Sequence, residues 1–274
     1  MGSIKETYTT AVEKNTGIKG KAALVTGGAR GIGLAIADRL ASDGAALMLV
    51  DCNAEQLAEA AAELTKKGAK VVTMVADVTK RDEVAAAIDS AEAQLGSFDI
   101  MINNAGIAQV APIAEITEAD IDKVHAINVK GVLWGIQLAA AKFKARGHGG
   151  KIISACSIAG HEGFPLLGAY CSTKFAVRSL TQVAAKEFAS DGITVNAYCP
   201  GVVGTDMWVE IDSRFAQLTG AKVGATFDKF VNGIALGRPE NPTDVAKFVS
   251  YLSGPDSDYM TGQCVLIDGG MVYR

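Results

Sequence analysis

Short apolar runs alternate with longer alanine-rich segments along this chain of 274 residues. The apolar runs have the length of buried strands, and we expect strands at residues 22–26, 46–51, 70–76, 99–103, 151–154, 194–198 and 264–268. The segments between them predict helices at residues 32–42, 54–67, 81–95, 118–145, 169–190 and 242–252. Strands that alternate with helices form parallel sheets. The pattern therefore predicts an α/β fold in which helices cover both faces of one doubly wound, parallel, seven-stranded sheet.

The composition favours a single domain. Hydrophobic residues make up 49% of the chain and charged residues 20%, which is enough apolar material for one large core. The polar first 20 residues predict a flexible N-terminal arm, so we expect the folded domain to span residues 21–274. Residues 205–237 fall between strand-like runs and are long for a plain loop. Loops of this length are often lids over a binding site.

The charge pattern and the short apolar runs argue against several classes of partner. The net charge is −4 with dispersed Lys and Arg, so we expect neither nucleic acid nor an anionic membrane as a partner. The longest apolar runs, such as residues 45–50, are far shorter than the roughly 20 residues needed to span a bilayer. Residues 1–21 are polar and lack the apolar core of a signal peptide, so we expect a cytoplasmic protein.

Cysteine and histidine are too scattered to suggest a metal site. The five cysteines are an odd number without a C-x-x-C pair, which argues against a disulfide framework and against a zinc site. We expect small buried side chains, although Cys156 and Cys171 each lie next to a candidate catalytic residue, which leaves thiol sensitivity open. We expect ordinary surface or loop histidines at His125, His148 and His161.

A glycine-rich segment, T-G-G-A-R-G-I-G at residues 26–33, follows the first expected strand directly. Gly27, Gly31 and Gly33 allow backbone amides to approach a pyrophosphate, and the start of the next helix adds positive potential. Such a triplet also occurs in simple tight turns. Its place between a strand and a helix, with Asp51 at the end of the second strand, favours the dinucleotide site of a Rossmann fold.

Asp51 also predicts which dinucleotide binds. A carboxylate at this position accepts hydrogen bonds from the adenosine ribose hydroxyls and repels a 2′-phosphate, which favours NAD over NADP. Arg30 argues the other way, because a basic side chain in the glycine-rich segment can pair with a 2′-phosphate. Neither Arg nor Lys follows Asp51, where Cys52 and Asn53 stand instead, so we expect NAD(H) as the cofactor.

Polar residues also end the third and fourth expected strands. Asp77 and Val78 follow the third strand, and N-N-A-G at residues 103–106 ends the fourth. These residues lie at the carboxyl edge of the sheet, where open α/β sheets bind their ligands. Because Asp, Asn and Gly are also common in ordinary turns, the two segments carry little weight alone.

Tyr170 and Lys174 stand four residues apart in Y-C-S-T-K, and Ser157 lies thirteen positions upstream of Tyr170. Four residues span about one helical turn, so the phenol and the ammonium project from the same face of a helix. The two groups can act on one ligand as a proton-transfer device. An ordinary pair on a surface helix is the alternative, but the upstream serine and the glycine-rich segment favour the catalytic interpretation.

These motifs occur together in one order: T-G-x-x-x-G-x-G at 26–33, N-N-A-G at 103–106, Asn128, Ser157, Y-x-x-x-K at 170–174 and P-G at 200–201. In this combination the chain resembles the short-chain dehydrogenases/reductases over about residues 21–274. The resemblance implies a nicotinamide-dependent oxidoreductase that acts on small ketones and alcohols, commonly as a homotetramer. It also implies a set of cofactor contacts, at Gly27, Arg30, Gly31, Ile32, Gly33, Asp51, Cys52, Asp77, Val78, Asn104, Ala105, Gly106, Tyr170, Lys174, Pro200, Gly201, Val203 and Thr205.

The resemblance further implies a catalytic tetrad of Asn128, Ser157, Tyr170 and Lys174. Tyr170 would be the general base for the alcohol, with its pKa lowered by Lys174 and by the charged nicotinamide. Lys174 would also hold the nicotinamide ribose hydroxyls, and Ser157 would donate a hydrogen bond to the substrate oxygen. Asn128 would offer its backbone carbonyl to a water in the proton relay, although an Asn inside a helix more often faces solvent.

Longer stretches resemble the acetoin (diacetyl) reductase and 2,3-butanediol dehydrogenase branch: residues 129–137, 147–157, 198–208 and 255–263. Enzymes of the meso type in this branch typically carry Gln and Asn where this chain has Ile158 and Phe164. Without those amides the substrate's second oxygen loses hydrogen-bond partners, and the change resembles the L-type, (S,S)-selective members. Trp208 would close over the small substrate, or simply pack in the core.

Two other functions remain open. A polyol or sugar-alcohol dehydrogenase of the same fold would need several polar groups in its pocket, where Ile158, Phe164 and Trp208 stand. A non-catalytic, dinucleotide-binding regulatory protein would be expected to lack part of the tetrad, which is complete here. A zinc-dependent alcohol dehydrogenase would need clustered ligands that this sequence does not offer.

Overall fold

The structure is a computed structural model and describes residues 17–273. Most of the N-terminal arm expected at residues 1–20 lies outside the described residues. Residues 17–20 form a turn in which Ile18 is buried in the core, and the Gly20 amide donates a hydrogen bond to the carbonyl of Gly44 at 3.0 Å. The chain therefore already packs against the core a few residues before residue 21.

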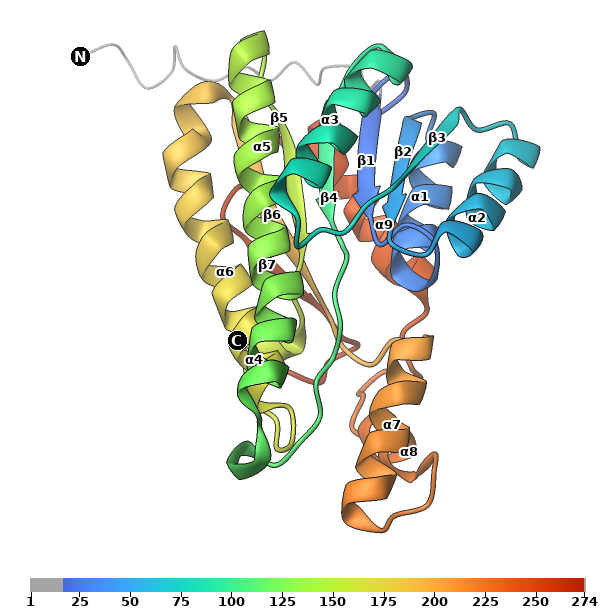
Figure 1. Ribbon diagram of the computed structural model, residues 1–274, viewed down its shortest axis with the longest axis vertical. Coiled ribbons are helices and arrows are strands. Elements are labelled where there is room, and N and C mark those ends of the chain that lie inside the picture. The colour runs from blue at the N-terminus through green and yellow to red at the C-terminus, as the bar shows by residue number, and fades with distance from the viewer. Residues whose placement is uncertain (1–16, 274) are drawn as a thin grey trace.

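Seven parallel strands form one sheet in the order β3-β2-β1-β4-β5-β6-β7 (Figure 1). The order runs outward from β1 in both directions, which confirms the predicted doubly wound parallel sheet. Each strand lies within two residues of its predicted range. The bounds are β1 Ala22–Thr26, β2 Ala46–Asp51, β3 Val71–Val75, β4 Ile100–Asn103, β5 Gly150–Ala155, β6 Ile193–Pro200 and β7 Cys264–Ile267.

Helices cover both faces of the sheet (Figure 1). One face carries α1 (Gly31–Ser42), α2 (Ala54–Lys66) and α9 (Pro242–Ser253), and the other carries α3 (Arg81–Leu95), α5 (Gly131–Arg146) and α6 (Gly168–Phe188). Neighbouring residues of β1 show the division: Leu24 belongs to the core cluster beneath α3, α5 and α6, and Val25 to the cluster beneath α1, α2 and α9. Burial on both faces explains why the strands are continuous apolar runs.

The helix predicted at residues 118–145 is interrupted in the structure. It consists of α4 (Glu118–His125), a π-helical turn η3 (Ala126–Lys130) and α5. The amide of Gly131 bonds the carbonyl of Ala126 five residues back, which inserts one extra residue into the turn. The change of phase turns Asn128 inward, where it is completely buried.

Residues 205–237, expected as a long lid loop, contain two helices. These are α7 (Asp206–Thr219) and α8 (Ala225–Val231), which project beyond the carboxyl edge of the sheet (Figure 1). Asp212 is buried and joins the two helices, because its carboxylate accepts hydrogen bonds from the amides of Gly224 and Phe227. Short 3₁₀ turns elsewhere are η2 Ile113–Glu115, η4 Ile158–Gly160, η5 Ala189–Asp191 and η6 Pro255–Ser257. Among the described helices, none is both long and apolar enough to cross a bilayer.

Candidate active site

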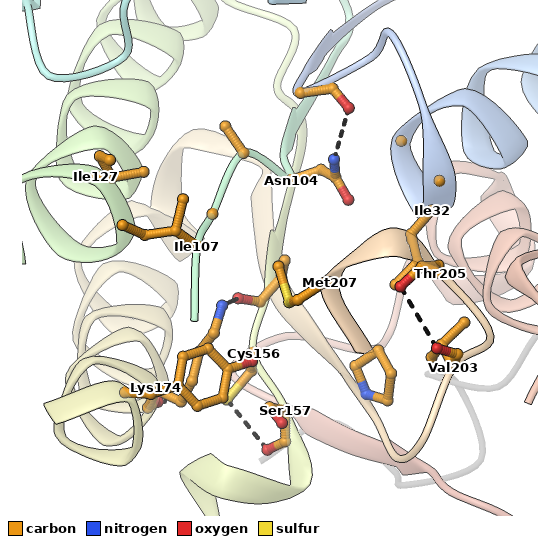
Figure 2. Close-up of a pocket in the computed structure, with 18 of the residues that line it drawn as sticks. Ile32, Asn104, Ile107, Ile127, Cys156, Ser157, Lys174, Val203, Thr205 and Met207 are labelled. Carbon is orange, nitrogen blue, oxygen red and sulfur yellow. Dashed lines mark hydrogen bonds between the residues drawn. The ribbon is translucent and has the colours of Figure 1, made fainter. Parts of the chain in front are cut away.

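One cavity lies at the carboxyl edge of the sheet, between the strand ends and the two helices α7 and α8 (Figure 2). It brings together residues from segments that are up to about 200 positions apart in sequence, because parallel strands all end at the same edge. Every predicted cofactor and substrate residue lines this cavity, and of the predicted tetrad only Asn128 does not. The sequence therefore predicted which residues line the cavity. Lining the cavity does not test the role of each residue, so the roles stay predictions.

Tyr170 and Lys174 lie one turn apart on α6, as their spacing predicted. The Lys174 ammonium lies 5.5 Å from the centre of the Tyr170 ring. It is buried and donates a hydrogen bond of 2.8 Å to the carbonyl of Ala155, at the end of β5. Figure 2 shows Lys174 and Ser157 on the same side of the cavity. A cation is thus fixed beside a phenol at the bottom of the site.

Ser157 lies two residues after the end of β5 and caps the N-terminus of the 3₁₀ turn η4. Its hydroxyl oxygen accepts a hydrogen bond from the amide of Ala159 at 3.1 Å, which fixes the side chain toward the cavity wall. Burial raises the pKa of the Tyr170 phenol, and the nearby Ser157 hydroxyl offsets part of that rise. The serine is therefore already coupled to the tyrosine that would exchange the proton.

Burial is the largest influence on the pKa values of both Tyr170 and Lys174. It raises the pKa of Tyr170 above its ordinary value and lowers the pKa of Lys174. Removing a charged group from water disfavours its charged form, and the Ser157 hydrogen bond offsets only part of this for the phenol. The lowering of the Tyr170 pKa that we expect from Lys174 together with the charged nicotinamide concerns the occupied site, and it stays a prediction. A cationic group bound in the cavity would act in the opposite direction to burial.

Asn128 is completely buried next to the cavity and does not line it. Its side-chain amide donates hydrogen bonds to the carbonyl of Ile107 at 2.9 Å and to the hydroxyl of Thr173 at 3.1 Å. Its side-chain oxygen accepts one from the amide of Ile107 at 2.9 Å. These bonds tie the segment after β4 to α6, and they exclude the solvent-facing alternative for this residue. The predicted relay through its backbone carbonyl stays a prediction.

The glycine-rich turn after β1 makes room for a large ligand. Gly27 and Gly31 adopt positive φ angles of 63° and 56°, which favour glycine. Gly33 packs so tightly that an added Cβ atom would lie 2.0 Å from the carbonyl oxygen of Gly27. The turn therefore presents bare backbone to the cavity at the N-terminus of α1, which fits a dinucleotide pyrophosphate.

Asn104 binds protein groups instead of facing the cavity freely. Its side-chain amide donates hydrogen bonds of 3.0 Å to the carbonyls of Thr26 and Gly27, and its side-chain oxygen accepts one of 2.9 Å from the hydroxyl of Tyr198. Figure 2 shows the side chain directed at the turn after β1. The residue fastens three strand ends together, so its contribution to a cofactor site is to hold the turn in place.

Asp51 and Arg30 lie at the outer end of the cavity. The Asp51 carboxylate accepts hydrogen bonds from the amides of Ala29 at 3.2 Å and Asn53 at 3.1 Å, which fix it beside the glycine-rich turn. The Arg30 guanidinium donates to the carboxylate of Asp206 on α7 at 2.8 Å. Both partners of this ion pair are largely exposed. Arg30 is thus already neutralised by the segment that covers the cavity.

The inner end of the cavity has an apolar wall. Ile158 is buried, and Phe164 and Trp208 both pack on Phe230 of α8, with ring centres 6.1 and 5.2 Å apart. Trp208 therefore does both things expected of it, because it lines the cavity and also packs among aromatic rings. Further apolar residues that the sequence did not single out complete the wall: Ile107, Ile127, Leu167, Met207, Ile211 and Phe230.

The remaining cysteines and histidines form no metal centre. Within residues 17–273 there is no group of three or more His, Cys, Asp or Glu side chains placed to hold a metal ion. All five cysteines are free thiols, and Cys156, Cys171 and Cys199 are buried as small side chains. His161 is half-buried with its Nε2 atom 3.3 Å from the Cys199 sulfur, and it is therefore not an ordinary surface residue.

Comparison with known proteins gives consistent matches over nearly the whole chain. Residues 21–215 match the family model described as short chain dehydrogenase. An L-2,3-butanediol dehydrogenase of Corynebacterium glutamicum is 49% identical over 93% of this chain and 99% of its own length. An (S)-acetoin-forming diacetyl reductase of Staphylococcus aureus is 51% identical over 93% of this chain and 98% of its own.

Solved structures of similar fold cover the chain equally well. Levodione reductase has a TM-score of 0.86 at 32% identity and covers 92% of this chain and 97% of its own. A protein from Agrobacterium tumefaciens, solved with bound NADP, has a TM-score of 0.84 at 30% identity and covers 96% of this chain and 100% of its own.

The raised pKa of Tyr170 predicts a measurable difference from an ordinary phenol. In cofactor-free protein we expect Tyr170 to stay protonated at pH 10, because burial disfavours the tyrosinate. The measurement is the tyrosinate absorbance of wild type minus that of Tyr170→Phe, titrated from pH 7 to 10.5. Tyr259→Phe removes a fully exposed phenol and supplies the reference curve. Half-ionisation of Tyr170 below pH 10 would contradict the expectation.

Proposed function

The chain belongs to the short-chain dehydrogenase family, as its sequence motifs predicted, and we propose that it is an NAD(H)-dependent member that interconverts diacetyl, acetoin and 2,3-butanediol. The proposal includes a preference for (S) centres. One observation carries it: the Tyr170, Ser157 and Lys174 groups lie beneath a wall of purely apolar side chains in a cavity that begins at a dinucleotide turn. Relatives named for these reactions support it.

In the direction of reduction, Ser157 and Tyr170 donate hydrogen bonds to the substrate carbonyl oxygen and fix its position. Reduced nicotinamide, when bound, supplies the hydride that reaches the carbonyl carbon. Tyr170 then gives its proton to the developing alkoxide. Burial keeps this phenol protonated, which is the form that the reductive direction needs. After Tyr170 has given up its proton, a protonated Lys174 can return one toward the phenolate. Burial lowers the pKa of Lys174, which makes it a readier proton donor.

The apolar wall supports the stereochemical part of the proposal. A diketone has two oxygens, and only one of them is held by Ser157 and Tyr170. Ile158 and Phe164 offer no hydrogen bond to the second oxygen, and a buried polar group without a partner costs about 1–3 kcal/mol. The substrate therefore turns its methyl group to this wall and its second oxygen away from it. This orientation presents one face of the carbonyl to the hydride.

Asp51 and the ion pair between Arg30 and Asp206 support NAD(H) as the cofactor. Asp51 would accept hydrogen bonds from the adenosine ribose and would repel a 2′-phosphate. Arg30 is the group that would favour the phosphate, and the Asp206 carboxylate neutralises it. The glycine-rich turn would hold the pyrophosphate and Lys174 the nicotinamide ribose. The Agrobacterium protein was solved with bound NADP, so proteins of this fold include one that takes the phosphorylated cofactor.

A polyol dehydrogenase and a regulatory dinucleotide-binding protein are the less favoured functions. The inner wall has none of the polar groups that a chain of hydroxyls would need, and the catalytic groups are in place around the cavity. A homotetramer and a cytoplasmic location stay predictions.

Stereochemically resolved turnover tests the proposed function. With NADH and diacetyl, we expect mainly (S)-acetoin and then (S,S)-2,3-butanediol, measured by chiral gas chromatography, with little activity on sorbitol or galactitol. The double variant Ile158→Gln with Phe164→Asn supplies two amides at the inner wall, and we expect it to shift the product toward meso-butanediol. Mainly meso or (R,R) product from the wild type would refute the (S) preference, and preferred oxidation of polyols would refute the substrate class.

Cofactor choice has its own prediction. Asp206→Asn removes the charge that neutralises Arg30, so we expect the ratio of kcat/KM for NADPH to that for NADH to rise about 2- to 5-fold, as for an exposed ion pair of about 0.5–1 kcal/mol. Asp51→Ala should raise the same ratio by removing the repulsive carboxylate. Adding Arg30→Ala to Asp206→Asn should cancel the gain. An unchanged ratio in Asp206→Asn would show that Arg30 does not contribute.

A further inference from the structure

Glu240 is a buried acid that the reaction does not use. It lies two residues before α9, where it forms an isolated β-bridge with Val203, is only 8% exposed, and does not line the cavity. Its amide donates a hydrogen bond of 2.8 Å to the carbonyl of Val202, and its carbonyl accepts one of 3.0 Å from the amide of Gly204. The backbone of Glu240 therefore runs along residues 201–205, which follow β6 and form one wall of the cavity.

The side chain of Glu240 holds the same wall from outside. One carboxyl oxygen, Oε2, accepts a hydrogen bond of 3.2 Å from the amide of Gly201. The other, Oε1, is buried without a hydrogen-bond partner. Gly201 is closed in from the far side as well, because an added Cβ atom there would lie 2.9 Å from the Cβ atom of Asp268. The Gly201 amide is shared, because it also donates a hydrogen bond of 3.2 Å to the carbonyl of Ile267 on β7. Gly201 is thus held by the Glu240 carboxyl group, by β7 and by the side chain of Asp268.

The charges around Glu240 do not compensate for its burial. Burial raises its pKa to about 8, with smaller increases from Asp244 on α9 and Asp268 after β7, while the Gly201 amide and Arg238 lower it. Arg238 is already paired with Asp244 at 2.8 Å. The Asp268 carboxylate accepts hydrogen bonds from the amides of Gly270 and Val272. An ionised Glu240 would therefore have one hydrogen bond and two neighbouring carboxylates.

We propose that Glu240 is a positioning residue whose neutral form holds the 201–205 wall against the cofactor, and whose ionisation releases that wall and weakens cofactor binding. A buried carboxylate gains solvation by moving outward, and the hydrogen bond from Gly201 moves the wall with it. This inference rests on the proposed function, because it assumes that residues 201–205 contact a bound dinucleotide.

The protonated and ionised forms of Glu240 determine how cofactor affinity should change with pH. Burial raises the pKa of Glu240 to about 8, from the ordinary value of 4.5 for an exposed Glu. Between these two pKa values, the arrangement with Glu240 buried binds more protons than one with Glu240 exposed to water. The stabilisation that the Glu240 proton contributes therefore falls as pH rises and is lost above the pKa of the buried group. Cofactor affinity should therefore be highest in mildly acidic solution and should fall through pH 8.

The test is the dissociation constant of NADH, measured by its fluorescence on the full-length protein without substrate, at intervals from pH 6 to 9. We expect the wild-type constant to rise several-fold across this range. Glu240→Gln keeps the shape and cannot ionise, so its constant should stay flat and close to the wild-type value at pH 6. Glu240→Ala should bind weakly at every pH. Glu210→Gln, an exposed Glu on α7, should retain the wild-type profile.

Thermal melting without cofactor, at the same pH values, separates positioning from stability alone. We expect the wild-type melting temperature to fall relative to that of Glu240→Gln as pH rises. Parallel NADH profiles for wild type and Glu240→Gln would overturn the inference, even if their melting temperatures diverged, because Glu240 would then be only structural. Failure of the wild type to bind either NADH or NADPH at pH 6 would instead refute the dinucleotide site of the proposed function, and this inference with it.

Discussion

The hydrogen bonds of Asn104 are the contact on which the rest of the cavity depends. Its side chain joins the end of β1, through the carbonyls of Thr26 and Gly27, to the end of β6, through the hydroxyl of Tyr198. An added Cβ atom on Gly33 would lie 2.6 Å from this side chain. The turn after β1 can therefore approach a ligand because three strand ends are drawn together and because Gly27 in the turn and Gly33 at the start of α1 have no side chains. Each buried polar atom of this contact has a partner, which makes it stable in a dry environment.

Burial and charge oppose each other at the catalytic groups inside the cavity and at Glu240 outside it. At Tyr170 and Lys174, burial favours the neutral forms and keeps the phenol protonated until a positive ligand or a developing negative oxygen changes the balance. At Glu240, burial favours the neutral acid, which fits the backbone that it supports. Burial therefore favours the neutral form of all three groups. Occupation of the site, more than the protein alone, decides when the phenol ionises.

The sequence predicted the fold and the chemistry well because both depend on local patterns. Apolar runs located all seven strands, and parallel topology alone brings Gly27, Asp51 and Ser157 to one edge.

The π-helical turn around Asn128 was not predictable, because Asn128 is held there by hydrogen bonds to Thr173 and Ile107, which are distant in sequence. The spacing of Trp208, Ile211 and Phe215 is typical of one helix face, and it is the signal for α7 within the segment expected as a loop. Long-range partners such as Tyr198 for Asn104 and Glu240 for Gly201 have no signature in a single sequence.

The central claim is that Tyr170 transfers the proton in a nicotinamide-linked reaction, and Tyr170→Phe tests it most directly. The variant keeps the ring and its packing and removes only the hydroxyl. We expect NADH to bind with nearly wild-type affinity while kcat for diacetyl reduction falls roughly 10²- to 10⁴-fold, the range of general acid catalysis. Turnover within tenfold of wild type, with binding retained, would contradict the assignment of Tyr170 as the proton donor.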